Sequence, residues 1–207
     1  MNVWLFAVIL SRLIPQSSPQ GQQAPALAGQ APQLPPGAAR LVNFDRRDGL
    51  VALCAETTDP PVTRGARKIR PTQVWFDDGR SVRVVTAAAG ARDPVWSPSG
   101  ERLAFVALDG LWVVARGSDK GQRLVPSSRP EDVPPSEFKD LTFSKPQWSP
   151  DGSRVAYLVG NGGTSWVEVV DAETGTAVYK SPPENYEFSW GQNARSLRIG
   201  GRLVRIP

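Results

Sequence analysis

A short motif that recurs along the chain constrains its fold more than any other feature. The segment Trp96–Gly100 reads W-S-P-S-G and returns as W-S-P-D-G at Trp148–Gly152. Each copy continues with an aliphatic residue, an alanine and an aromatic residue, in Leu103–Phe105 and again in Val155–Tyr157. The two copies lie about 50 residues apart, a spacing typical of solenoids, propellers and other repeat arrays.

Two less exact copies of the motif lie at a similar spacing before and after these two. Phe44 precedes an Asp48-Gly49 turn signal and an aliphatic-alanine-aliphatic triplet, and Trp190 precedes an Asn-containing turn and an apolar alternation. The four copies predict four similar structural units.

Each copy also continues in the same way. Short runs of β-branched and aromatic residues alternate with Asp- and Gly-rich turns, as in Val74–Phe76 followed by Asp77–Gly79. This alternation predicts a four-stranded antiparallel meander. We therefore expect an all-β chain, a β-propeller-like array of about 3.5 to 4 four-stranded antiparallel blades. The expected blades are 41–86, 92–126, 143–180 and 186–207, and the last has residues for only some of its strands, which predicts an open or incomplete ring.

The pattern W-S-P-D-G-x-x-[LV]-A-[FY] resembles the WD-like repeat of TolB-type propellers, over roughly residues 40–207. Similar blades form the lid domains of prolyl-oligopeptidase-like hydrolases. The first resemblance implies a non-catalytic scaffold that binds proteins or ligands in the cell envelope. The second implies the alternative, a propeller portion of a serine hydrolase whose nucleophile lies on a separate domain.

Several conspicuous residues have structural interpretations. Trp96 and Trp148 occupy the same strand position in their copies of the repeat, so we expect them to pack in the interface between neighbouring blades. Stacking on a ligand is the alternative. Asp151 is expected to be an acceptor within its turn. The single Cys54 lies at an apolar strand position and is expected to be a small buried hydrophobe.

The N-terminal region has features of an export signal. Residues 3–10 form an apolar run too short to span a bilayer, and Ala26–Ala28 has the small-x-small pattern of a cleavage site. No Lys or Arg precedes the run. We predict a signal peptide in residues 1–28, a Pro/Gln-rich linker in 29–39, and a periplasmic or secreted mature chain without an integral membrane span. An uncleaved membrane anchor and an N-terminal strand are the alternatives.

Composition excludes several chemistries. The chain has no histidine and one cysteine, so a Ser-His-Asp or Cys-His catalytic group and the usual His/Cys zinc sites cannot form within it. No G-x-S-x-G elbow, phosphate-binding loop or dinucleotide-binding glycine motif is present. We predict no catalytic residue, no cofactor and no metal, and therefore no enzyme activity.

Basic residues gather in one insertion. The chain has 24 Lys and Arg against 20 Asp and Glu, a net charge of +4. Part of the excess lies in Arg64, Arg67, Lys68 and Arg70, which are the candidate partner-binding residues. The favoured interpretation of this segment is a solvated loop, and the alternative is contact with an acidic partner, a lipid headgroup or nucleic acid. No nucleic-acid-binding motif accompanies these residues. The expected partner is a protein, with self-association through exposed blade edges as a further option.

Overall fold

The computed structural model describes residues 31–207 except 65–66, 86–89, 128–140, 162 and 185–186. Every regular element in this part of the chain is a β-strand. The predicted signal peptide lies outside the described residues. Among the residues described, no helix is long and apolar enough to cross a membrane.

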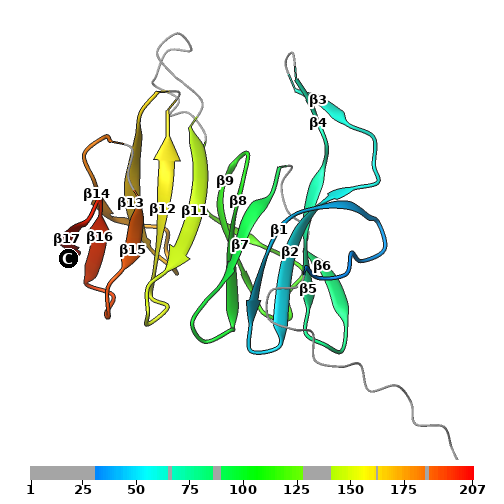
Figure 1. Cartoon of the computed structure of the whole chain (residues 1–207), viewed down its shortest axis with the longest axis horizontal. Helices are drawn as coiled ribbons and strands as arrows, with labels where there is room; N and C mark the ends of the chain where they lie inside the picture. Colours follow the sequence, from blue (N-terminus) through cyan, green and yellow to red (C-terminus); the bar gives the residue numbers. More distant parts are fainter. Residues whose placement is uncertain (1–30, 65–66, 86–89, 128–140, 162, 185–186) are drawn as a thin grey trace, which may run out of the picture. The chain divides into compact units, whose positions relative to one another are not determined.

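Four antiparallel sheets, here called sheets I to IV, follow one another along the described chain (Figure 1). Sheet I contains β1 (Ala38–Arg47), β2 (Leu50–Thr57), β5 (Thr72–Asp77) and β6 (Val82–Val85). Sheet II contains β7 (Arg92–Trp96), β8 (Arg102–Ala107), β9 (Gly110–Ala115) and β10 (Gln122–Pro126). Sheet III contains β11 (Thr142–Trp148), β12 (Arg154–Gly160), β13 (Ser165–Asp171) and β14 (Ala177–Lys180). Sheet IV contains β15 (Phe188–Trp190), β16 (Ser196–Ile199) and β17 (Arg202–Arg205).

The predicted fold class is confirmed. Sheets I to III each have four antiparallel strands in consecutive spatial order, and sheet IV has three in the described part of the chain. One element was not predicted: a small hairpin of β3 (Val62–Arg64) and β4 (Arg67–Ile69), which lies between β2 and β5 in the sequence.

The repeated motif forms the turn between the first two strands of sheets II and III. In sheet III, Gly152 N–H donates to Ser149 O at 2.9 Å, and Gly152 has a φ of 72°. This left-handed conformation is one that glycine adopts easily. The Asp151 carboxylate accepts hydrogen bonds from Ser149 Oγ at 2.7 Å and from Ser153 N at 2.9 Å. Asp151 is therefore a turn acceptor, as predicted.

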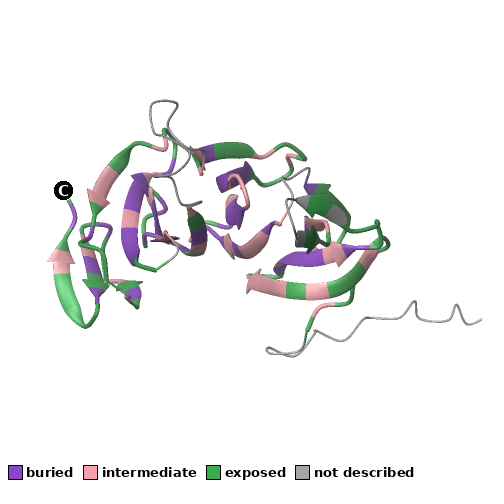
Figure 2. Ribbon diagram, turned by 90° about the horizontal axis from the view of Figure 1, so that it is seen from above, coloured by how far each residue is buried: buried purple, intermediate pink, exposed green. Residues whose placement is uncertain are grey.

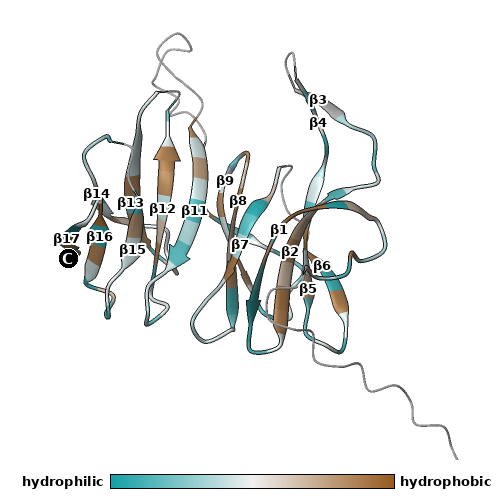
Figure 3. Ribbon diagram, in the orientation of Figure 1, coloured by the Kyte–Doolittle hydropathy of each residue, from teal (hydrophilic) through white to brown (hydrophobic). Residues whose placement is uncertain are grey.

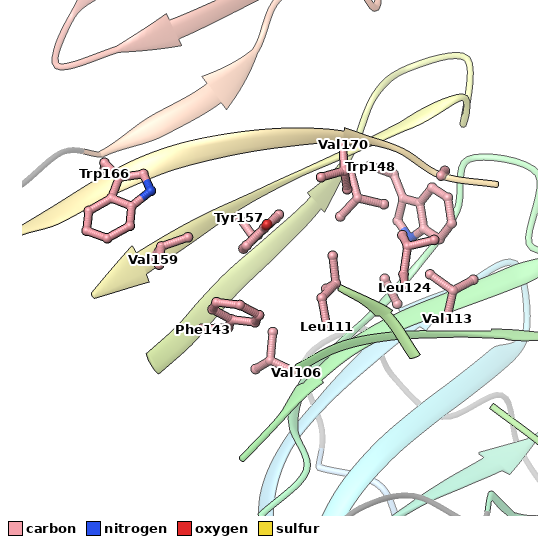
Figure 4. Close-up of a cluster of buried hydrophobic side chains, with 13 residues drawn as sticks. Val106, Leu111, Val113, Leu124, Phe143, Trp148, Tyr157, Val159, Trp166 and Val170 are labelled. Atoms are coloured by element: carbon pink, nitrogen blue, oxygen red, sulfur yellow. The ribbon is translucent and has the colours of Figure 1, made fainter. Parts of the chain in front are cut away.

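Hydrophobic clusters hold adjacent sheets together. One cluster joins sheets I and II, a second joins sheets II and III, and a third joins sheets III and IV. In the second cluster, Trp148 packs with Val113 and Leu124, and Phe143 meets Tyr157 edge-on with ring centroids 5.1 Å apart (Figure 4). Figure 3 shows hydrophobic segments along β2 and β12, in the interior of their sheets.

The prediction that Trp96 and Trp148 pack between neighbouring blades is confirmed. Trp96 is 3% exposed in the cluster between sheets I and II, and Trp148 is 7% exposed in the next cluster. Cys54 is fully buried, and burial raises the pKa of its thiol. This matches the expected small buried hydrophobe.

Arginines reach from one sheet to the next. Arg102 of sheet II donates to the carbonyl oxygen of Gly152 at 2.6 Å and to that of Ala172 at 3.3 Å, both in sheet III or its turns. Arg154 occupies the same repeat position and donates to the carbonyl oxygens of Ala194 and Pro207 in the sheet IV region. These contacts connect successive sheets in the same way.

The array is open. Sheets I and IV lie at opposite ends of the row in Figure 2, with sheets II and III between them. The face of sheet I that points away from sheet II is covered by its own first strand, since Ala38, Leu41 and Phe44 of β1 pack against a cluster that contains Trp75. Trp75 is only 1% exposed. Sheet I therefore buries this face without contact from sheet IV.

Candidate interaction surfaces

The basic insertion folds as the β3–β4 hairpin rather than as an irregular loop. Its backbone pairs Thr63 with Lys68 and Arg64 with Arg67. At its base, Thr57 N–H donates to Pro71 O at 2.8 Å, which continues the pairing of β2 with β5. Figure 1 shows the hairpin extending past the end of sheet I.

The predicted contact residues differ in what surrounds them. Lys68 and Arg70 are exposed. Arg70 Nε lies 3.7 Å from Glu56 Oε2, and Arg40 also donates to Glu56. These cations, the hydrogen bond from Arg40 most of all, lower the pKa of Glu56. Lys68 forms no ion pair with any described residue, so its charge is available to a partner.

Residues that sequence reasoning missed form a small pocket between sheets I and II. Its volume is about 80 Å³, room for roughly two or three water molecules. It is lined by Leu50, Phe76, Asp77, Asp78, Ser81, Arg83, Trp96, Arg116 and Gly117. Backbone N–H groups of Ser81 and Arg80 lower the pKa of Asp78. The lining comes from several strands of two sheets, so no sequence motif marks this pocket.

A polar network links the first strands of sheets I, II and III. Asn43 Nδ2 donates to Asp93 Oδ1 at 2.5 Å, and Lys145 N–H donates to Asp93 Oδ2 at 3.2 Å. Asp93 and Lys145 occupy the same repeat position and both have positive φ, 55° and 52°. Strained backbone can mark a functional site, but Asp93 is satisfied here by groups of the chain itself. We therefore assign the network to holding the strands together.

Within the described residues, no group of three or more His, Cys, Asp or Glu side chains is placed to hold a metal ion.

The comparisons with known proteins concern the fold. No model of a known protein family matches the chain, and no curated protein matches it. Among solved structures, it is similar to an acylaminoacyl peptidase from Pyrococcus horikoshii, with 14% identity and a TM-score of 0.56. It is also similar to the β-propeller domain of the Trilobed protease from Pyrococcus furiosus, described as having an open velcro topology, with 13% identity and a TM-score of 0.55. TolB from Acinetobacter baumannii matches with 16% identity and a TM-score of 0.46.

These matches cover most of this chain but a smaller part of the others. The three alignments cover 77%, 78% and 76% of this chain, and 27%, 48% and 41% of the peptidase, the Trilobed protease domain and TolB. The chain thus spans less than half the length of each. At such low identity, the two matches with the higher TM-scores show that the fold is that of a β-propeller.

Proposed function

We propose that this chain is a non-catalytic binding scaffold that contacts an acidic protein partner through the β3–β4 hairpin. The observation that supports this most is that the hairpin lies outside the backbone pairing of sheet I. Strands β2 and β5 pair directly from Val51 with Asp77 to Glu56 with Thr72, without any contribution from β3 or β4. Long insertions on a rigid scaffold commonly carry binding functions.

The charge of the hairpin favours an acidic partner. Arg64, Arg67, Lys68 and Arg70 place four cations in one short segment of the sequence, and the Arg70 guanidinium lies 3.7 Å from the carboxylate of Glu56. A local excess of positive charge attracts acidic surfaces over a distance and accelerates association. Salt screens such attraction, so binding through this hairpin should weaken as ionic strength rises.

The proposed compartment is the periplasm or the extracellular space, on the basis of the apolar run and the small-x-small pattern in residues 1–28. Cell fractionation with an antibody against the mature region tests it. Recovery in the soluble periplasmic or culture fraction, with an N-terminus after Ala28, would support export. Recovery with the membranes and an intact N-terminus would instead indicate an anchor.

A charge-neutralised hairpin tests the binding proposal. The variant carries Arg64→Gln, Arg67→Gln, Lys68→Gln and Arg70→Gln. Its control neutralises four exposed cations of sheets I and II, in R80Q, R116Q, K120Q and R123Q, and so has the same net charge. In quantitative pull-downs from a periplasmic extract, partners should be retained by the wild-type chain and by the control but lost from the hairpin variant. Equal recovery by both variants, or no partner on the wild-type chain, would contradict the proposal.

A second candidate is the propeller portion of a prolyl-oligopeptidase-like hydrolase. It is favoured because similar structures with TM-scores above 0.5 include an acylaminoacyl peptidase and the propeller domain of a protease. In such enzymes the propeller controls substrate access, and the nucleophile lies on a separate domain. The coding sequence beyond Pro207 distinguishes the two: a G-x-S-x-G motif with a downstream Asp and His supports the hydrolase, and a stop codon there rules it out.

A further inference from the structure

The junction between sheets II and III holds an arginine against a tryptophan. Arg102, the first residue of β8, lies over the ring of Trp148, with its guanidinium carbon 4.9 Å from the ring centroid. Its guanidinium also donates to the carbonyl oxygens of Gly152 and Ala172. Arg154, the first residue of β12, donates to two carbonyl oxygens at the next junction. A guanidinium between an aromatic ring and carbonyl oxygens is favourable, because the ring face and the oxygens are both negative.

The junction between sheets I and II has a leucine at this position. Leu50 is the first residue of β2, as Arg102 is of β8, and it is buried. Its side chain lies against Gly100, since a Cβ added to Gly100 would be 3.1 Å from Leu50 Cδ1. Gly100 is the repeat counterpart of Gly152, which accepts a hydrogen bond from Arg102. A leucine side chain has no donor, so it cannot make the contact that Arg102 makes.

Two carbonyl oxygens at this junction correspond to the acceptors of Arg102. The backbone N–H groups of Arg116 and Ala172 donate to equivalent carbonyl oxygens in their own sheets, so these two residues are repeat counterparts. Among the residues that the structure describes, none donates to the carbonyl oxygen of Gly100 or of Arg116. Arg83 of sheet I reaches a neighbouring carbonyl oxygen instead, that of Gly117, at 3.3 Å. Both counterpart oxygens can therefore accept hydrogen bonds from a ligand.

The pocket between sheets I and II lies at this place. Its floor is formed by the buried Leu50, Phe76 and Trp96, and its rim by the exposed Ser81, Arg83, Arg116 and Gly117. Trp96 is the repeat counterpart of Trp148, the tryptophan under Arg102. The volume of about 80 Å³ is well below the roughly 300–1,000 Å³ of pockets that enclose a whole small molecule. The pocket therefore suits the head of a side chain rather than an entire ligand.

The charges around the pocket favour a cation. Asp77 and Asp78 line it, and each uses Oδ1 to accept hydrogen bonds from its own turn, whereas no described residue donates to Oδ2 of either. On the rim, Arg116 Nη1 lies 3.8 Å from Glu101 Oε1. Carboxylates therefore outnumber guanidinium groups here, with Asp77, Asp78 and Glu101 against Arg83 and Arg116. Such an excess of negative charge is complementary to a positively charged group.

We infer that this pocket receives the arginine side chain of a protein partner. The guanidinium would lie against the Trp96 ring and donate to the carbonyl oxygens of Gly100 and Arg116, in the arrangement that Arg102 has at the next junction. A lysine fits less well, because its ammonium is compact and strongly hydrated, whereas a guanidinium is a planar fork of donors that stacks on an aromatic ring. The pocket is separate from the β3–β4 hairpin, so its test does not depend on the function proposed above.

NMR titration of the full ¹⁵N-labelled chain with a blocked Gly-Gly-Arg-Gly-Gly peptide tests the inference. The signals of the Trp96 indole N–H and the Gly117 amide should shift with a Kd on the order of 1 mM. The matched lysine peptide should bind about tenfold more weakly or worse. L50R should lose these shifts, because its own guanidinium reaches the two carbonyl oxygens. L50M keeps an apolar side chain of similar volume and should bind like the wild-type chain.

Two further comparisons separate recognition of the guanidinium from simple blockage of the pocket. D77N/D78N should bind the arginine peptide about tenfold more weakly, and asparagine can still accept the hydrogen bonds of the turn. E173Q/E187Q, which removes two exposed carboxylates beside sheets III and IV, should bind like the wild-type chain. L50R should also unfold at a higher temperature than L50K, because only the arginine fork can donate to both oxygens.

The inference is overturned if the arginine peptide causes no shift, if the lysine peptide binds equally well, or if D77N/D78N binds no more weakly than E173Q/E187Q. Shifts caused by methylguanidinium but not by the arginine peptide would also overturn it, since the pocket would then be a site for a small free cation.

Discussion

At the scale of single residues, the repeated tryptophans differ in hydrogen bonding: Trp96 and Trp148 are buried and Trp190 is half-buried. Trp148 Nε1 donates to Val95 O at 2.9 Å, and Trp190 Nε1 donates to Gln147 O at 3.1 Å. Both acceptors directly precede the tryptophan of the previous copy. Trp96 Nε1 is buried and has no hydrogen-bond partner among the described residues. The same motif position thus carries a satisfied donor in two copies and an unsatisfied one in the third.

This difference predicts unequal costs for the same substitution. Trp148→Phe removes a hydrogen bond between sheets II and III, whereas Trp96→Phe removes a buried donor that has no acceptor. Both lose similar ring area, so Trp148→Phe should reduce the free energy of unfolding by about 1 kcal/mol more than Trp96→Phe. Urea unfolding followed by far-UV circular dichroism measures both. Equal losses would mean that the Trp148 bond contributes nothing.

Turn carboxylates predict how stability responds to acid. Asp171 accepts hydrogen bonds from Thr174 N at 2.9 Å and from Glu173 N at 3.0 Å, and these bonds, that from Thr174 most of all, lower its pKa. A group whose pKa is lower in the folded state stabilises the fold above its unfolded pKa, about 3.9 for Asp. That contribution is lost as the pH falls through the folded value.

The Asp171→Asn variant should therefore be less stable than the wild-type chain near neutral pH, and the difference in Tm should shrink as the pH is lowered below about 4. Thermal unfolding at a series of pH values measures this. Asp119→Asn, in an exposed turn of sheet II, controls for the loss of one negative charge. A Tm difference that grew with acidification would show that folding does not lower the pKa of Asp171.

At the scale of elements, each sheet is an antiparallel meander, and sheet I carries the β3–β4 hairpin between its second and third strands. Its base is closed by the Thr57–Pro71 hydrogen bond, so the ends of β2 and β5 are already positioned for a short connection. The ion pair that links this insertion to sheet I joins the exposed Arg70 to the half-buried Glu56 at 3.7 Å. Exposed ion pairs contribute little to stability.

Replacement of residues 58–70 by Asn-Gly, combined with Pro71→Thr to supply the backbone N–H that the new turn needs, should therefore leave the fold intact. Asn-Gly suits a two-residue hairpin turn, and the shorter loop costs less entropy to close. We expect unchanged far-UV circular dichroism and a free energy of unfolding within about 1 kcal/mol of the wild-type value. A large loss of stability would show that the hairpin supports sheet I, and would weaken the case that it is there for binding.

At the scale of the whole molecule, stability is distributed through contacts between neighbouring sheets. The three clusters that join sheets each combine two adjacent sheets. Sheet IV packs on sheet III alone among these clusters and presents Arg198 and Leu203 on its other face. Arrays of this kind are stabilised by nearest-neighbour interfaces, and a terminal unit has fewer of them.

Native-state hydrogen exchange should reveal this gradient. Amides of β8 and β12, inside sheets II and III, should exchange most slowly, and those of β16 should exchange faster because sheet IV can open without disturbing sheets I and II. Mass spectrometry of peptic fragments measures each region separately. If β16 were protected as strongly as β12, the chain would unfold as a single cooperative unit.

Some functional candidates were accessible from the sequence and others were not. The basic segment was visible as a cluster of charges, although its hairpin was not, because strands as short as β3 and β4 have too few residues to show a period. The exposed Arg198 of sheet IV is visible in the sequence, because it stands at the repeat position where the other copies have alanine. The pocket beside Trp96 has no such signal, because its lining residues are dispersed from Leu50 to Gly117.

The sequence by itself determined the strands of the four sheets, the repeated turns, and the burial of Trp96 and Trp148. These depend on the alternation of apolar residues and on Ser-Pro-x-Gly chemistry, which act between neighbours in the chain. Only the tertiary structure decided which groups meet across sheets: the arginine contacts of Arg102 and Arg154, and the packing of β1 against the cluster around Trp75. Those contacts join residues far apart in sequence, so they depend on how one sheet packs against the next.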